Sequence, residues 1–198
     1  MSAALALGLS APEQALVYRL CARLLLRELD AATVATLLAP GVAESLEAAA
    51  SGTTASLAGW DAAATEAHAE EFTRLFLIPG GVSPRAAAWG AGERERLGAG
   101  VAREVRALLP ALGRRVDAPA GVGRLPEDHV ALLLELAACG LEGADPARGL
   151  AFVAAAVTPW AQPFGLALGE RAALPIYRAL GTLIAQLHAA PAAAEETP

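Results

Sequence analysis

Apolar residues recur at helical spacing along most of this 198-residue chain. The pattern is clearest after Ser10 and Glu13, which have the spacing of a capping box and precede the apolar positions Leu16, Leu20, Cys21, Leu24 and Leu25. Hydrophobic residues make up 55% of the chain, and much of that share is alanine, the best helix former. β-branched and aromatic residues are sparse, and no strand pattern is evident. The sequence therefore predicts an all-α fold.

Proline, glycine and capping residues divide the chain into about seven to nine helices. After the first helix, the expected segments are Asp30–Leu38, Val42–Ala50, Thr54 or Trp60 to Leu77, Glu93–Leu112, Pro126–Cys139, Asp145 to about Trp160, and Glu170 or Pro175 to His188. No linker or repeat separates them. We predict a single-domain helical bundle over residues 1–188, followed by a disordered tail over residues 189–198.

Charge and motif content exclude several classes of function. The net charge of -6 argues against a nucleic-acid binder, which needs a basic face for phosphate contacts. The chain has no lysine, so a Walker motif is impossible. Its two cysteines and three histidines are scattered, which predicts no metal site. Residues 149–169 carry no charge, but their prolines, glycines and alanines favour a buried helix over a membrane span.

The cluster Glu127-Asp128-His129 allows several interpretations. It is compatible with a helix start, where carboxylates suit the helix dipole. It is also compatible with an acidic lip that binds a guanidinium group, or with acid–base catalysis. Adjacent helical residues point about 100° apart, however, so the three side chains are not expected to converge on one atom.

The apolar set Phe72, Leu75 and Phe76 also has two interpretations. Spacings of three and four place all three side chains on one helical face. This face is typical of core packing, but it would equally suit a groove for an amphipathic peptide. The spacing alone does not separate a buried face from a groove.

Four segments together resemble the TorD/DmsD/NarJ family of molybdoenzyme maturation chaperones. Glu71–Gly80 resembles the signature E-[YFW]-x-R-L-F-x-x-P-G, and Pro126–His129 resembles the Pro-x-Asp-His motif that follows some fifty residues later. Phe152–Phe164 resembles F-L-x-x-H-L-x-x-W-x-x-x-F, and the segment from Tyr177 to Leu180 resembles the closing F-Y-x-x-L-A helix. Their order and spacing span roughly residues 12–188.

The resemblance implies a cytoplasmic chaperone of the TorD/DmsD-like branch, with no catalytic activity, cofactor or metal of its own. Such a chaperone holds the twin-arginine signal peptide and the apo form of a DMSO-reductase-family enzyme until the molybdopterin cofactor is inserted. An acidic lip beside an apolar face would complement the arginine pair and the apolar stretch of that peptide. The predicted signal-peptide site comprises Phe72, Leu75, Phe76, Pro79, Gly80, Glu127, Asp128 and His129.

The chain departs from the family pattern in two places. Pro84–Trp89 lacks the acid and the serine of the family's P-x-E-S-x-Y segment, and Ala156 replaces the histidine of the third motif. Alternative functions are a helical scaffold for a different protein partner, or an acid–base enzyme around Glu127, Asp128 and His129. The chain is expected to be a monomer or a domain-swapped dimer, with loops 78–92 and 113–123 as candidate hinges.

Overall fold

The computed structural model describes residues 9–90, 94–112 and 125–188, and within these ranges the chain forms nine continuous helical segments, one short 3-10 turn, η3 (Ala86–Ala88), and no β-strand. The predicted all-α bundle is confirmed. The first segments are α1 (Ala11–Leu26), α2 (Ala31–Leu37), α3 (Val42–Ala49), α4 (Thr53–Leu57), and α5 (Ala62–Phe72) continued by the π-helical turn η2 (Thr73–Leu77). The others are α6 (Arg94–Ala111), α7 (Val130–Glu142), α8 (Pro146–Phe152) continued by the π-helical turn η4 (Val153–Val157) and α9 (Thr158–Arg171), and α10 (Pro175–Leu187). The predicted tail at 189–198 and the second hinge at 113–123 lie outside the described residues.

Local capping sets several helix starts where the sequence predicts them. Glu13 accepts a hydrogen bond from the backbone N–H of Ser10 at 2.7 Å, which completes the capping box of α1. Asp30 accepts from the N–H of Thr33 at 2.7 Å and caps α2, and Asp145 caps α8 in the same way. Asp61 caps α5 close to Trp60, the later of the two predicted starts, and separates this helix from α4.

Two predicted helix boundaries are wrong. Pro126 does not open a helix, since α7 begins at Val130 with His129 as its N-cap, and Glu127 and Asp128 lie in the preceding turn. Pro159 does not end a helix, because the segment from α8 continues through η4 and α9 to Arg171. The wider π-helical turn before Pro159 accommodates a residue that has no N–H to donate.

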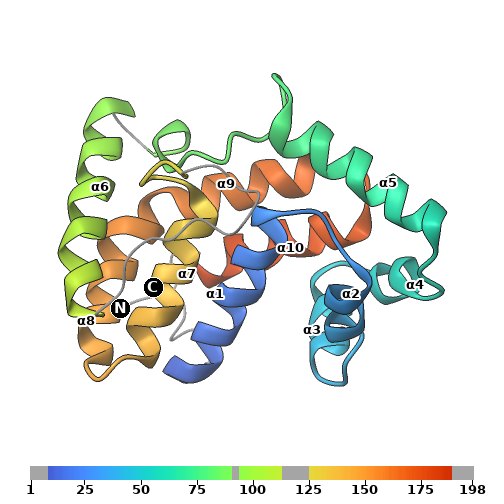
Figure 1. Cartoon of the computed structure of the whole chain (residues 1–198), viewed down its shortest axis with the longest axis horizontal. Helices are drawn as coiled ribbons and strands as arrows, with labels where there is room; N and C mark the ends of the chain where they lie inside the picture. The colour runs from blue at the N-terminus through green and yellow to red at the C-terminus, as the bar shows by residue number, and fades with distance from the viewer. Residues whose placement is uncertain (1–8, 91–93, 113–124, 189–198) are drawn as a thin grey trace, which may run out of the picture.

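The helices pack around a core built mainly from α1, α7, α9 and α10. Figure 1 shows α1 and α7 side by side, α6 and α8 together at one end of the molecule, and α2, α3 and α4 grouped at the other. The largest fully buried side chains include Trp160, Tyr18, Tyr177 and Phe164. α9 crosses α10 at very short range. A Cβ atom on Gly181 would lie only 2.6 Å from the carbonyl oxygen of Gly165, so both positions need glycine or a shift of the helices.

Residues 146–171 form the one helix among the described residues that is long and apolar enough to cross a membrane by length and composition. The core helix of a soluble protein passes the same test, and 44% of the most apolar window of this helix is buried within the protein.

Candidate functional site

A loop after η2 lies against the turn that precedes α7. The backbone N–H of Val130 donates to the carbonyl of Pro84 at 2.9 Å, and the N–H of Ala86 donates to the carbonyl of Asp128 at 2.8 Å. These two bonds form an isolated antiparallel bridge between Arg85 and His129. The bridge brings together two segments that the sequence analysis treated separately.

The Asp128 carboxylate lies at the centre of this contact. Its side chain is only 5% exposed, and Oδ1 accepts a hydrogen bond from Nε of Arg85 at 2.5 Å. The other oxygen, Oδ2, is buried and has no hydrogen-bond partner among the residues that the structure describes. The Arg85 side chain is 53% exposed, so a buried carboxylate here holds a guanidinium group that lies half in solvent. Hydrogen bonds between such ionised groups are about twice as strong as neutral ones.

The neighbours of Asp128 have different partners. Glu127 accepts two hydrogen bonds from the guanidinium of Arg106, at 3.0 and 2.6 Å. His129 uses Nδ1 to accept from the N–H of Ala131 at 3.3 Å. Burial lowers the pKa of His129; the nearby Asp128 carboxylate opposes this shift and the Arg85 guanidinium adds to it. The imidazole is therefore biased towards its neutral form, which suits its role as a helix cap.

The acid–base hypothesis requires polar groups that converge on one reacting atom. Within the described ranges, no hydrogen bond joins Glu127, Asp128 and His129 to one another, and each contacts a different group. In the same ranges, no group of three or more histidine, cysteine or acidic side chains is placed to hold a metal ion. The geometry of the cluster is that of two arginine-binding carboxylates beside a helix cap.

The second predicted group, Phe72, Leu75 and Phe76, belongs to the hydrophobic core in this structure. The three residues are 4%, 0% and 8% exposed. Phe76 makes edge-to-face contacts with Phe72, at 5.1 Å between ring centroids, and with Tyr177, at 6.0 Å. The question that periodicity left open is answered in favour of burial. Pro79 and the adjoining glycine, by contrast, are exposed.

Glu71 and Arg74 of the same segment have a structural task that the sequence analysis missed. The Glu71 carboxylate accepts two hydrogen bonds from Arg74, at 2.7 and 2.8 Å, and one from the N–H of Ala173 at 2.6 Å. Arg74 also donates to the carbonyl of Arg171 at 2.7 Å. The pair therefore ties the end of the α5 segment to the connection between α9 and α10.

The arginine partners of these carboxylates differ in whether a sequence pattern predicts them. Glu71 and Arg74 are three residues apart, which is a spacing that predicts an ion pair on a helix. Arg85 and Arg106 lie 43 and 21 residues from the carboxylates they bind. No local pattern predicts these two contacts, because they depend on how the loop and α6 fold back onto the start of α7.

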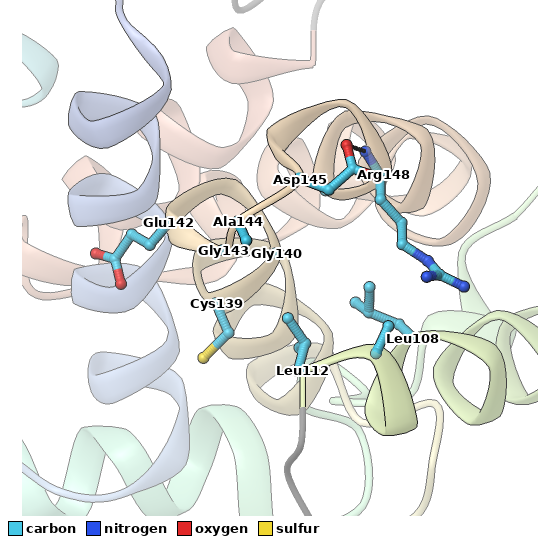
Figure 2. A pocket seen from close by; sticks show the side chains of 11 residues that line it. Leu108, Leu112, Cys139, Gly140, Glu142, Gly143, Ala144, Asp145 and Arg148 are labelled. Atoms are coloured by element: carbon cyan, nitrogen blue, oxygen red, sulfur yellow. Dashed lines mark hydrogen bonds between the residues drawn. The ribbon is translucent and has the colours of Figure 1, made fainter.

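The structure also has cavities away from this cluster. A cavity of about 420 Å³ lies between the ends of α6 and α7 and the start of α8. Its lining includes Leu108, Leu112 and Arg148 (Figure 2). None of the predicted site residues lines it. A shallower hollow of about 380 Å³ on the outer face of α5 includes Glu66 and Glu70, and it also lies apart from Asp128.

A comparison with protein families matches residues 36–164, about two thirds of the chain, to a model described as nitrate reductase delta subunit. The matched range includes both the Glu71–Gly80 and the Pro126–His129 segments. No curated protein matches the chain significantly.

Proposed function

We propose a function from the premise that the chain belongs to the nitrate reductase delta subunit family, the family of the NarJ- and TorD-type chaperones. Membership implies a role in the maturation of a molybdoenzyme, with a subunit of that enzyme as the partner. The family is one of chaperones and is not catalytic. We propose further that this chain acts in the cytoplasm as a TorD/DmsD-like member. It would bind the twin-arginine signal peptide and the apo form of a DMSO-reductase-family enzyme until the molybdopterin cofactor is inserted.

The observation that supports peptide binding is that two successive carboxylates each hold an arginine. Asp128 binds Arg85 and Glu127 binds Arg106. A twin-arginine signal peptide presents two successive guanidinium groups, and planar guanidinium groups pair with carboxylates more specifically than lysine does. The same two carboxylates are therefore suited to receive the arginine pair of a client.

The buried apolar residues Phe72, Leu75 and Phe76 have an indirect role in this proposal. Phe72, Leu75 and Phe76 are covered in the structure and precede the exposed turn at Pro79 and Gly80, so a peptide reaches them only if the residues packed against them move. We propose that they support this turn and His129 supports the start of α7, while the peptide contacts the exposed turn and the two carboxylates. A Phe76→Ala variant would then lose core packing as well as binding, which makes it a poor test of contact.

A sharper test uses Asp128→Asn, which keeps the shape of the side chain and removes its charge. The probe is a synthetic peptide with an Arg-Arg pair followed by a stretch of leucine and alanine, titrated calorimetrically. We expect Asp128→Asn to bind about tenfold more weakly, because hydrogen bonds to charged groups contribute roughly 1.5–3 kcal/mol.

The matched control is Asp30→Asn. Asp30 also binds an arginine, Arg23, at 2.9 Å, but it lies at the start of α2, and asparagine keeps its capping role. We expect this variant to bind the peptide with wild-type affinity, and a Lys-Lys version of the peptide to bind the wild type more weakly. Equal affinities of the Asp128→Asn and Asp30→Asn variants would contradict the assignment of the site.

A further inference from the structure

We propose that Arg85 occupies the position on Asp128 that an arginine of the client peptide would take. The chain's own loop then competes with the peptide for Asp128. This inference rests on the proposed function and adds a regulatory contact to the same site. It makes Arg85 a residue that sets the affinity of the chaperone and favours release of the peptide.

The first support is the chemistry of the contact. Arg85 presents to Asp128 the same guanidinium group that a twin-arginine peptide would present. It contacts Oδ1 from a position that is half in solvent, whereas the carboxylate itself is buried. Movement of the Arg85 side chain would therefore open Oδ1 to solvent and to an incoming arginine.

The second support is that the internal contact is incomplete. Within the described part of the chain, Arg85 donates to Asp128 through Nε alone, and Oδ2 is buried and accepts no hydrogen bond. A carboxylate can accept two parallel bonds from one guanidinium group. An arginine that enters with better alignment would satisfy both oxygens, and this gives the client an advantage over the internal competitor.

The third support is that access to Asp128 requires movement of one side chain, that of Arg85. The backbone around Arg85 is held by the bridge to His129, and Ala86 is fully buried. Trp89 fixes the end of the loop, because its Nε1–H donates to the carbonyl of Ser83 at 2.8 Å and its ring packs against Phe164. Exchange of one arginine for another thus requires a rotamer change and leaves the loop in place.

The experiment compares wild type with Arg85→Gln, using the Arg-Arg peptide and calorimetric titration. We expect Arg85→Gln to bind the peptide about fivefold more tightly. In wild type, the partly exposed Arg85–Asp128 ion pair occupies the carboxylate in most molecules, and removing it raises the fraction of molecules that can bind by roughly this factor. The control is Arg178→Gln, because Arg178 is exposed and has no ion pair within the described residues. It removes the same charge and is expected to bind like wild type. In an Asp128→Asn background, Arg85→Gln should give no gain.

Thermal unfolding of each sample shows whether the variants are folded. If the uncompensated Asp128 prevents Arg85→Gln from folding, Arg85→Lys decides, because lysine is a poorer partner for a carboxylate fork and should tighten binding about twofold. Peptide binding to wild type with no gain in the folded variant overturns this inference and leaves the proposed function standing. If neither wild type nor variant binds the peptide, both proposals fail.

Discussion

Replacing Glu71 with alanine removes a buried carboxylate that accepts four hydrogen bonds, two from Arg74 and one each from the N–H groups of Ala173 and Leu174. The two bonds from Arg74 are discounted, because that side chain is 46% exposed and can be solvated in the variant. The two backbone donors lose a charged acceptor, at about 1–2 kcal/mol each. We therefore expect Glu71→Ala to lower the free energy of unfolding by about 3 kcal/mol.

Urea unfolding followed by circular dichroism measures this change, and Glu70→Ala is the matched control. Glu70 is the adjacent residue on α5 and is exposed, and its side chain has no hydrogen bond or ion pair within the described ranges. We expect it to change the free energy of unfolding by less than about 0.5 kcal/mol. Equal unfolding midpoints for the Glu71→Ala and Glu70→Ala variants would refute the structural role assigned to Glu71.

The same carboxylate makes stability depend on pH. Burial alone would raise the pKa of Glu71, but the hydrogen bonds from Arg74 and from the N–H of Ala173 outweigh it, and the pKa is lowered from 4.5. A lowered pKa in the folded state stabilises the protein above the unfolded value and loses this contribution as pH falls below it. The Glu71→Gln variant should therefore lose less stability than wild type between neutral pH and pH values below 4.5.

Two further predictions concern the helix contacts. Gly181→Ala should lower the free energy of unfolding by about 2 kcal/mol, since the added Cβ would lie 2.6 Å from the Gly165 carbonyl oxygen. The control is Gly169→Ala, which has open space around its added Cβ and should be neutral or slightly stabilising in thermal unfolding. Burial lowers the pKa of His188 to about 4 from 6.5, so the free energy of unfolding should fall as pH drops through this window. His188→Gln should flatten that part of the plot of stability against pH, and an unchanged slope would contradict the role given to His188.

The features that could be predicted from the sequence are those set by neighbouring residues. The capping box at Ser10 and the caps at Asp30 and Asp145 act over three residues, so their helix starts were predicted correctly. The boundary at Pro126 was wrong because a distant loop bonds to the backbone there and holds it out of the helix. The boundary at Pro159 was wrong because a π-helical turn changes the bonding pattern just before the proline.

The candidate site shows the same division. Periodicity placed Phe72 and Phe76 on one face of a helix, but burial of that face depends on what packs against it, here Tyr177 of α10. The acidic character of Asp128 was visible, whereas its partner Arg85 was not, since the ion pair spans 43 residues. Sequence patterns therefore indicated the chemical groups of the candidate site, and tertiary contacts determine which of them are exposed and which are already paired.

The turn at Gly80 and Gly81 connects the Glu71–Gly80 segment to the loop that contacts the Pro126–His129 segment. Arg171 donates to the carbonyl oxygens of Gly80 and Gly81, at 3.0 and 2.6 Å, from the end of α9. Gly81 must be glycine or its neighbourhood must shift, because a Cβ atom there would lie 2.3 Å from the carbonyl oxygen of Leu75. This turn leads directly into the loop that carries Arg85 to Asp128. The Glu71–Gly80 segment thus positions the loop that contacts the Pro126–His129 segment. Glu71 anchors the same junction, so we expect its loss to weaken peptide binding as well as stability.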